Sequence, residues 1–416
     1  MKNRTLKEQL VRKHLSEIGR ILVLTGARQT GKTTLLKNSF IDHAWILLDD
    51  PVLRIQYASM TAQQWKEIYP CAILDEVQKL PQLIETVKAI YDTYKNTRYV
   101  LSGSSQLLLL EKVKESLAGR CQIMELFPLT LPEMLTIGWN DETSPSFFQK
   151  LLSGEATTAD LVPSVLMLPD HAVRLQTFQY YLKFGGYPAI IGENLSDQDR
   201  YDWLRGYVRT YLERDIRDLA DFRNLEPFVL TQQMTALHTA QTLNYSTLAK
   251  ESGITSATAK RFISYLEISY QIILLRPWFR NQHKRLVKSP KLHYLDIGVQ
   301  HAILQKQGGM AGNEFESAVV AELYKQSRYQ QAAAGFFHLR TLDGREVDLL
   351  IETEKGYYAI EVKMTVNARR HDASNLVGLD SLLDKPLLAS FVLSNDPVIK
   401  QLGDNITAIP VAMFLT

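Results

Sequence analysis

The sequence has few cysteines and no long hydrophobic run. Its two cysteines, Cys71 and Cys121, each lie in an apolar stretch with the pattern of a central strand. This predicts buried thiols in a reducing compartment and no disulfide. No apolar run reaches the roughly 18 residues of a membrane-spanning helix, and the charged N-terminus lacks the apolar core of a signal peptide. We therefore expect a cytoplasmic protein without membrane contact.

Net charge is also small. The 47 basic and 45 acidic residues give a formal charge of +2, so any nucleic-acid surface has to come from local clusters of basic residues. The hydrophobic content of 45% and charged content of 22% are typical of a folded protein. The length allows roughly two to four domains.

Short apolar runs alternate with helical patterns between residues 21 and 126. The runs are ILVLT, AWILLD, CAILD, RYVLSGS and CQIMEL. Strands that alternate with helices form parallel sheets, because each crossover helix returns the chain to the same edge. The sequence therefore predicts an α/β domain with a parallel sheet at its start.

A phosphate-binding loop follows the first of these strands. The pattern GxxxxGK[ST] is met by GARQTGKT, and a helical segment comes directly after it. Glycines let successive backbone N–H groups turn toward a phosphate, the lysine reaches the β and γ oxygens, and the threonine hydroxyl binds Mg2+. The residues predicted to contact the nucleotide are Gly26, Ala27, Arg28, Gln29, Thr30, Gly31, Lys32, Thr33 and Thr34.

Two carboxylates end the third apolar run, CAILDE. Asp75 at the carboxyl end of a buried strand is predicted to hold the magnesium shell together with Thr33. Glu76, the next residue, is predicted to orient or deprotonate the attacking water. A surface pair of acids is common, but a pair that ends a buried strand is not.

Small polar residues end the next strand, RYVLSGS. Ser102 or Ser104 is the predicted sensor of the γ-phosphate, because it would lie between the loop and the two carboxylates. Serine and glycine also end strands without any ligand, and that alternative stays open.

These motifs together resemble the AAA+ superfamily and, within it, the archaeal-type ATPases related to signal-transduction ATPases. The resemblance lies in GARQTGKTTLL, DEVQ, LSGSS and SLAGR. The family often has proline where Ala27 stands. The resemblance implies ATP and Mg2+ as cofactors and a homo-oligomer as the assembly.

Two further residues are implied by this resemblance. Arg120, in SLAGR, matches an arginine that reaches the nucleotide of a neighbouring subunit; it could instead cap the preceding helix or pair with a surface carboxylate. Pro188, in FGGYPAI, matches a proline of the helical lid that packs near the adenine. A plain turn between helices explains the same pattern.

Two segments point to nucleic acid. STLAKESGITSATAKRFISYLE has helix-turn-helix spacing, and the following YQIILLRPW resembles the hairpin of a winged helix. In a DNA-bound pose its second helix would present residues to phosphate or bases. A winged helix can also act as a lid or a protein contact. The residues concerned are Thr255, Ser256, Thr258, Lys260 and Arg261.

The second segment, RPWFRNQHKRLVKSPK, is basic and aromatic and contains no acid. Such a strip suits contact with a nucleic-acid backbone and stacking on bases. A solvated loop or a subunit contact is the alternative. Its residues are Arg276, Trp278, Phe279, Arg280, His283, Lys284, Arg285, Lys288 and Lys291.

The C-terminal region carries acids on two neighbouring strands. GREVDLLIETEKGYYAIEVK predicts a hairpin with Asp348 on one strand and Glu361 and Lys363 on the same face of the next. This resembles the PD-(D/E)xK nucleases, with Val347 in place of the proline. The resemblance implies that Asp348 and Glu361 hold Mg2+, that Glu316 adds a helical acid, and that Lys363 positions a water. Alternating charge on an exposed strand is the simpler alternative.

Four domains are expected. They are a P-loop domain over 1–145, a helical lid with an irregular insertion over 146–225, a winged helix-turn-helix over 226–305, and an α/β restriction-endonuclease-like domain over 306–416. The leading hypothesis is an ATPase that couples nucleotide state to DNA binding and to metal-dependent cleavage. The alternative is a slow ATP-dependent switch whose C-terminal domain only docks a partner.

Overall fold

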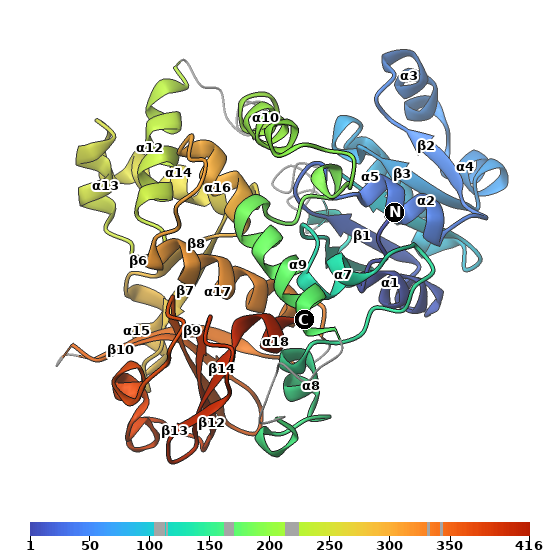
Figure 1. The fold of residues 1–416 in the computed structure, drawn as a ribbon. Coiled ribbons are helices and arrows are strands. Elements are labelled where there is room, and N and C mark those ends of the chain that lie inside the picture. Colours follow the sequence, from blue (N-terminus) through green and yellow to red (C-terminus); the bar gives the residue numbers. More distant parts are fainter. Residues whose placement is uncertain (104–112, 114, 162–169, 213–223, 331–332, 342–343) are drawn as a thin grey trace.

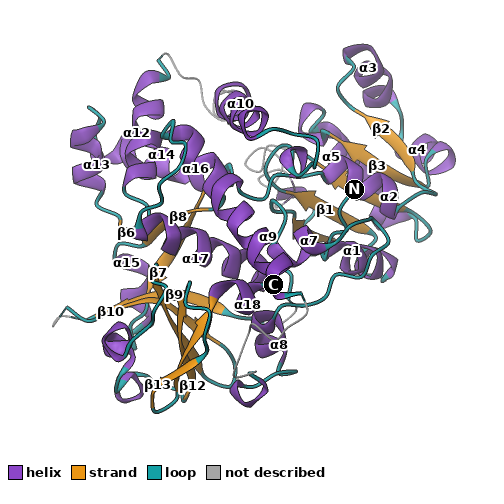
Figure 2. Cartoon of the chain, viewed as in Figure 1, coloured by secondary structure: helices purple, strands orange, loops and turns teal. Residues whose placement is uncertain are grey.

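Two sheets organise the molecule (Figures 1 and 2). The structure is a computed structural model that describes residues 1–103, 113, 115–161, 170–212, 224–330, 333–341 and 344–416. The N-terminal sheet has five parallel strands in the order β2-β3-β4-β1-β5. This confirms the predicted α/β class. The strands are β1 (Ile21–Thr25), β2 (Ala44–Leu47), β3 (Cys71–Asp75), β4 (Arg98–Ser102) and β5 (Cys121–Glu125).

Helices cover both faces of the N-terminal sheet because its inner strands are apolar on both sides. Ile21 and Val23 of β1 pack with α4 and α5, whereas Leu22 and Leu24 belong to the core that includes α1 and α2. The helices are α1 (Leu6–Leu15), α2 (Lys32–Ser39), α3 (Pro51–Ser59), α4 (Ala62–Ile68) and α5 (Gln82–Thr93).

The two cysteines differ from expectation. Both are free and half-buried, and Cys121 lies on β5, which is an edge strand of the sheet. The apolar run around Cys121 predicted a central strand, but the sheet ends there.

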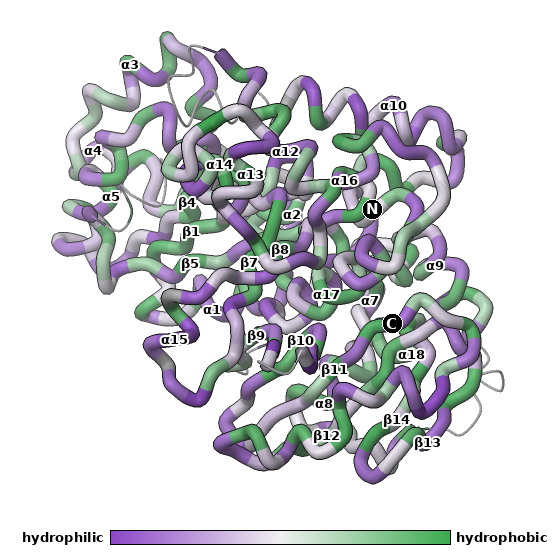
Figure 3. The backbone as a smooth tube through the Cα atoms, turned by 90° about the vertical axis from the view of Figure 1, so that its left-hand side faces the viewer, coloured by the Kyte–Doolittle hydropathy of each residue, from purple (hydrophilic) through white to green (hydrophobic). Residues whose placement is uncertain are grey.

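A series of helices connects the two sheets. Helix α9 lies between them in Figure 1 and packs against α7, α16 and α18. The helices of this segment are α7 (Leu131–Leu135), α8 (Phe147–Ser153), α9 (His171–Phe184) and α10 (Asp197–Tyr207). Figure 3 shows that α10, at the periphery, is mainly hydrophilic.

The second sheet has nine strands in the order β13-β14-β12-β11-β10-β9-β7-β8-β6. Three of these strands belong to what we call the helical unit, which comprises α12, α13 and α14 with β6, β7 and β8. With α15 and α16, which lie outside this unit as defined, the elements of this region are α12 (Glu226–Leu237), β6 (Gln241–Thr242), α13 (Tyr245–Glu251), α14 (Ser256–Ile268), β7 (Ile272–Pro277), α15 (Gln282–Val287), β8 (Lys291–Tyr294) and α16 (Ile297–Ile303).

The remaining strands form the C-terminal part of the same sheet. The expected helix over NEFESAVVAELYKQ and the hairpin with Asp348 and Glu361 are present as α17 and β10–β11. The elements are α17 (Gly312–Arg328), β9 (Gly335–Arg340), β10 (Glu346–Glu352), β11 (Tyr357–Lys363), β12 (Leu387–Ser394), β13 (Lys400–Gly403), β14 (Ile406–Pro410) and α18 (Val411–Leu415).

This sheet corrects the expectation of a hairpin after α14. The segment YQIILLRPW forms one strand, β7, and not a hairpin; its antiparallel partner β8 comes after the basic segment. On its other side β7 pairs in parallel with β9, through Arg276 with Phe337 and Pro277 with His338. Residues 226–305 and 306–416 therefore contribute strands to one sheet, and the boundary between them as domains stays a prediction.

Buried polar groups of α17 bind the N-terminal domain. Glu322 and Lys325 are fully buried and lie 2.7 Å apart. Glu322 also accepts a hydrogen bond from the backbone N–H of Leu131 at 2.7 Å, and Lys325 donates to the carbonyl of Leu129 at 3.3 Å. Because a buried ion pair without partners is costly, these contacts fix how the two halves of the molecule dock.

Two adjacent glycines make a close approach between the halves possible. Gly185 has a φ of +77°, and a Cβ at this position would lie 2.1 Å from Oδ1 of the buried Asp296. The N–H of Gly186 donates to Asp296 Oδ2 at 2.8 Å, and its carbonyl accepts from Leu129 N–H at 2.7 Å. The pattern FGGYP is therefore required for packing, whatever else it does.

Hydrophobic residues line the strands of both sheets (Figure 3). One continuous core extends from α1 and α2 through Phe127, Phe178 and Tyr270 to Phe315 and Phe391 of the C-terminal part. Among the described residues, no helix is both long and apolar enough to span a membrane.

His14 is a buried neutral group of the N-terminal domain. Its Nδ1 lies 3.1 Å from the carbonyl of Gly19, so Nδ1 donates, and Nε2 accepts from His43 Nε2 at 2.9 Å. Burial, with a further contribution from His43, lowers the pKa of His14 to about 4. The folded protein therefore resists protonation at this site.

Acid should destabilise the fold through His14. An unfolded histidine takes up a proton near pH 6.5, and the folded one only near 4, so stability is lost as pH falls between these values. From pH 7 to 5 we expect His14 to contribute a loss of about 2 kcal/mol. His14→Gln should show a shallower pH dependence of urea unfolding, and the exposed His283→Gln should not. Parallel curves for the wild type and His14→Gln would contradict this.

Candidate nucleotide site and its connections

The phosphate-binding loop joins β1 to α2 as the sequence predicts. Gly31 has a φ of +92° at the N-cap of α2, and no atom lies within 4 Å of a Cβ built there. The ammonium of Lys32 donates to the carbonyls of Gly26 and Ala27, each at 2.8 Å. The lysine is 8% exposed. The loop therefore places the Lys32 ammonium at the start of α2. The dipole of this helix favours a negatively charged ligand, such as a phosphate, at the same place.

Thr33 and Asp75 are brought together from separate elements. The Thr33 hydroxyl donates to Asp75 Oδ2 at 3.3 Å. Asp75 ends β3 and is 6% exposed, and burial followed by the charge of Glu76 raises its pKa above the usual range. A hydroxyl and a carboxylate oxygen at this spacing are ligands that Mg2+ accepts in nucleotide sites, so the donor set fits the predicted cation.

Glu76 leaves the strand in a different conformation. It has a left-handed backbone with φ +56° and ψ +40°, which is uncommon for a residue other than glycine. Its carboxylate accepts a hydrogen bond from the Gln78 amide. The two consecutive acids therefore differ: Asp75 is buried and Glu76 is half-buried. Different surroundings are what distinct roles for two carboxylates require.

The two predicted sensor residues have different outcomes. Ser102 is fully buried and lies directly opposite Asp75 in the parallel register of β3 and β4. Ser104 lies outside the described residues. The role of either serine stays a prediction.

A cavity of about 600 Å³ adjoins the loop. The first residues of the chain also line it, with Lys2 among them. Its apolar and aromatic lining suits a flat base. Pro188 thus lies at the cavity wall, next to the loop, although its contact with adenine stays a prediction. The lining includes Thr30, Gly31, Thr34, Trp139, Tyr180 and Pro188.

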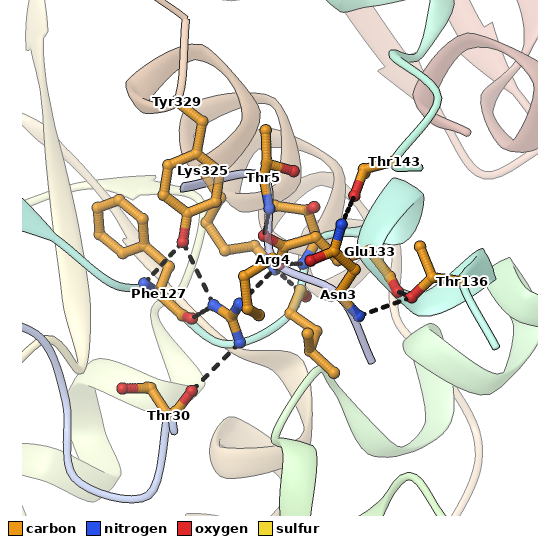
Figure 4. Close-up of polar contacts among 12 residues, drawn as sticks. Asn3, Arg4, Thr5, Thr30, Phe127, Glu133, Thr136, Thr143, Lys325 and Tyr329 are labelled. Carbon is orange, nitrogen blue, oxygen red and sulfur yellow. Dashed lines mark hydrogen bonds and ion pairs between the residues drawn. The ribbon is translucent and has the colours of Figure 1, made fainter. Parts of the chain in front are cut away.

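Arg4 fixes the floor of the loop (Figure 4). It is 5% exposed, and its guanidinium donates to the carbonyl of Thr30 at 3.2 Å, to the carbonyl of Phe127 and to the hydroxyl of Tyr329 at 3.4 Å. Its Nε lies 3.4 Å from Oε2 of the fully buried Glu133. One buried cation thus connects the N-terminus, the loop, the segment after β5 and the end of α17.

Two tyrosines connect the loop to distant elements. Tyr270, at the turn between α14 and β7, shares a hydrogen bond of 2.8 Å with Thr25, the residue before Gly26. Its hydroxyl also lies 3.1 Å from Glu125, which pairs with Arg328 of α17 at 2.9 Å. Tyr207 of α10 donates to the carbonyl of Arg28 at 3.2 Å. The loop and the residue before it are therefore connected by hydrogen bonds to α10 and to the turn after α14, and through Glu125 to α17.

Arg120 pairs within its own chain. Its Nε and Nη2 bind the two oxygens of Asp92 on α5 at 2.8 and 3.1 Å. This hydrogen bond lowers the pKa of Asp92. Pairing with a surface carboxylate was the alternative to a role at a neighbouring nucleotide. That role stays a prediction.

The exposed face of α14 matches the predicted DNA-reading helix. Ala259, Phe262, Ile263 and Leu266 are buried in the core of the helical unit. Thr258 is half-buried on the same helix. The exposed residues at its start and along its outer face are Thr255, Ser256, Lys260 and Arg261.

The basic strip after β7 is only partly exposed, which corrects the prediction for several residues. Trp278 is buried, with its indole N–H donating to Tyr357 at 3.1 Å, so it offers no stacking surface. Arg285 is buried against Trp278 and pairs with Glu352 at 2.8 Å. Lys291 is 1% exposed. The basic residues that remain on the surface are Arg276, Arg280, Lys284 and Lys288.

The C-terminal acids form a buried cluster, as the motif predicts, but with an extra lysine. Lys291 Nζ lies 2.6 Å from Glu316 and 3.3 Å from Asp348, while Lys363 lies 2.5 Å from Glu361. Burial, with the charge of Asp348, raises the pKa of Glu316 and of Glu361 above the usual range, and the neighbouring ammonium groups of Lys291 and Lys363 oppose this shift. Burial alone would lower the pKa of Lys291, but the surrounding carboxylates raise it.

This arrangement does not fit the predicted magnesium site at Glu316, Asp348 and Glu361. The Lys291 ammonium lies between Glu316 and Asp348, and Glu361 is paired with the Lys363 ammonium. Within the parts of the chain that the structure describes, no group of three histidine, cysteine, aspartate or glutamate side chains is arranged to hold a metal ion. The motif in the sequence indicated the acids. No pattern in the sequence indicated that Lys291 would lie among them.

Family comparisons divide the chain into three parts. Residues 19–135 match "AAA domain", residues 175–308 match "Domain of unknown function (DUF8612)", and residues 311–414 match "Domain of unknown function (DUF4143)". The AAA match covers the loop, Asp75 and Glu76. With the geometry above, it makes this part of the chain an ATPase domain of the P-loop type.

Similar proteins extend over most of the chain. An uncharacterized protein of Mycobacterium bovis is 26% identical over 356 residues, which cover 83% of this chain and 70% of that protein. One of Haemophilus influenzae is 20% identical over 394 residues, 88% of each chain. Among solved structures, the Walker-type ATPase PABY2304 of Pyrococcus abyssi aligns at 15% identity with a TM-score of 0.45, over 73% of this chain and 96% of that one. That score is too low to assign a function.

Sequence reasoning missed the residues that connect the halves of the molecule. Arg4 contacts residues 26, 123 and 325 positions away in the chain, and Tyr270 bonds to a residue 245 positions away. A basic residue near the N-terminus or a tyrosine after a helix carries no local pattern that distinguishes it from a surface residue.

Arg120 can be tested by separating its two partners. If it stabilises the transferring phosphoryl group of a neighbouring subunit, Arg120→Ala should reduce steady-state ATP turnover by about a thousandfold. Asp92→Ala keeps the guanidinium and removes its partner in the same chain, so turnover should be preserved. Wild-type turnover in both variants would make Arg120 a surface ion-pair residue, and light scattering with and without ATP would show whether subunits associate.

Proposed function

We propose that this protein binds and hydrolyses ATP and couples the nucleotide state to DNA binding by its helical unit. The observation that carries the first part is the meeting of Lys32, Thr33 and Asp75. The ammonium is folded onto the loop, and the hydroxyl and the buried carboxylate are 3.3 Å apart at the edge of the sheet.

Each residue of the site has a distinct task in this proposal. Backbone N–H groups from Gly26 to Thr33 bind the β-phosphate, and Lys32 exchanges its carbonyl partners for the β and γ oxygens. Glu76, half-buried beside Asp75, accepts a proton from the attacking water. Magnesium, which Thr33 and Asp75 would hold, supplies charge neutralisation for the phosphate oxygens when bound.

The adjoining cavity supports adenosine as the nucleoside part. It begins at Thr30 and Gly31, so a base that enters it leaves its phosphates over the loop. Pro188 and Tyr180 offer apolar surfaces for one side of the ring. The hydrogen bonds that select adenine over guanine are left open by this lining.

DNA binding rests on the order and exposure of the helical unit. Its elements follow as helix, strand, helix, helix, strand, strand, with β6 and β7 on either side of β8. This order supports the predicted winged helix, and α14 is its recognition helix. Lys260 and Arg261 are exposed there, and phosphate contacts by such residues supply most of the affinity for DNA.

The hydrogen bond between Thr25 and Tyr270 supplies a physical route for coupling. Thr25 precedes the loop directly, and Tyr270 is the second residue after α14. A rearrangement of the loop on nucleotide exchange alters this hydrogen bond or moves Tyr270. The same proposal includes a homo-oligomer as the active form. In this oligomer Arg120 reaches the nucleotide of the neighbouring subunit.

A second function is favoured by the position of Lys291. In this second function the C-terminal domain only docks a partner, and the Lys291 ammonium favours it over cleavage because it lies where a catalytic metal would bind. ATP turnover that rises with DNA favours the first function. Turnover that ignores DNA, with no Mg2+-dependent nicking, favours a slow switch that uses the domain only for docking.

The ATP site is tested by two substitutions that should act differently. Lys32→Ala should lower ATP turnover at least about a hundredfold and weaken nucleotide binding, because it removes the loop cation. Glu76→Gln should slow turnover by about a hundredfold or more yet retain bound ATP, since only the proton acceptor is lost. Turnover assays and filter retention of labelled ATP measure both effects.

The matched control is Lys37→Ala. Lys37 is an exposed lysine on the same helix and lies over the ring of Trp45. The Lys37→Ala substitution should leave ATP turnover unchanged. Normal hydrolysis by Lys32→Ala would refute the site.

DNA binding is tested on α14. A Lys260→Ala, Arg261→Ala double variant should weaken binding to duplex DNA, because two phosphate contacts are lost. The slope of log affinity against log salt should become shallower by up to about 1.8. Fluorescence anisotropy from low to moderate salt measures this. Lys355→Ala, an exposed lysine between β10 and β11, serves as the control. An unchanged salt slope in the double variant would exclude α14 as the contact.

A further inference from the structure

The acid cluster under α17 contains four carboxylates and two ammonium groups. Glu316 comes from α17, Glu346 and Asp348 from β10, and Glu361 from β11. Lys363 follows on β11, as the nuclease-like motif requires. Lys291 comes from β8, in the helical unit, and belongs to no part of that motif.

Lys291 lies at the centre of three of these carboxylates. Its Nζ is 2.6 Å from Glu316 Oε1, 3.0 Å from Glu346 Oε1 and 3.3 Å from Asp348 Oδ1. Its side chain is 2% exposed. An ammonium with three carboxylate partners at hydrogen-bonding distance has the contacts that a cation needs when it is removed from water.

The other oxygens of the two motif acids are also engaged. Asp348 Oδ2 accepts the backbone N–H of Val362 at 2.9 Å. Glu361 Oε2 binds Lys363 at 2.5 Å, and Oε1 accepts from the Asn375 amide at 3.4 Å. A divalent cation would need oxygens of this cluster at about 2.1 Å and would lie against the Lys291 ammonium.

The continuous sheet is what delivers this lysine. Strand β8 pairs with β7, with Leu275 opposite Lys291, and β7 pairs in turn with β9 of the C-terminal part. Lys291 is therefore held by backbone hydrogen bonds on the strand that carries it. The strand fixes the backbone of Lys291, and the burial of its side chain keeps the ammonium among the carboxylates.

We propose that the ammonium of Lys291 is the permanent cation of this cluster, in place of a divalent metal, and that it makes the C-terminal fold a closed structural site without cleavage chemistry. The cluster then joins the helical unit to the C-terminal strands through charge. This inference does not depend on the ATP site.

The proposal is tested with Mn2+ as the probe, on the full chain without nucleotide. Four proteins are compared by electron paramagnetic resonance and isothermal titration: wild type, Asp348→Asn, Lys291→Met, and the double variant Lys291→Met, Asp348→Asn. We expect wild type and Asp348→Asn to give the same Mn2+ binding curve. Lys291→Met should gain one Mn2+ site, with an affinity at least about tenfold higher than that of any Mn2+ binding by wild type. The double variant should lack this site.

Thermal unfolding supplies an independent readout. Lys291→Met should have a lower Tm than wild type, because three carboxylates lose their cation, and millimolar Mn2+ should raise the Tm of this variant but not of wild type. Lys288→Met, an exposed lysine of the preceding loop, is the matched control and should resemble wild type in both measurements.

Two results would overturn the proposal. One is Mn2+ binding by wild type that Asp348→Asn abolishes. The other is a folded Lys291→Met protein that gains no Mn2+ site. If Lys291→Met does not fold, the comparison of wild type with Asp348→Asn still decides the question.

Discussion

The arrangement of this molecule depends on a buried guanidinium at its N-terminus. Arg4 holds the carbonyl of Thr30 in the phosphate-binding loop and, with the same group, contacts Phe127, Glu133 and Tyr329. A buried charge tolerates little displacement, because each lost partner leaves a desolvated polar atom. The loop therefore has a fixed position relative to α7 and to the end of α17, and the nucleotide site is built on the contact between the two halves of the chain.

The phosphate-binding loop is bonded to elements outside its own sheet. Thr25, Arg28 and Thr30 all bond to residues outside the N-terminal sheet, so the loop is linked to distant elements on three sides. The Glu322–Lys325 pair and the Gly185–Gly186 approach to Asp296 fix neighbouring parts of the same boundary. Coupling between the ATPase domain and the rest of the molecule is thus short in space although long in sequence.

Local patterns predicted much of the fold and the centre of the nucleotide site. The five strands of the first sheet, the loop and the carboxylates after β3 are each defined by neighbouring residues, so periodicity and spacing were sufficient. Long-range facts were not accessible in this way. The pairing of β7 with β9 joined strands of two expected domains in one sheet, and Lys291, expected on a DNA surface, lies in the acid cluster. Arg4 gave no signal, because its partners come together only in the folded chain.

The same strand pairing limits how the protein can move. Rotation of α14 relative to the C-terminal strands would break the ladder between β7 and β9 and pull β8 away from α17. Residues on both sides of that ladder consequently share one rigid frame. A ligand held by α14 and one held beyond β9 would therefore keep the same separation and relative orientation.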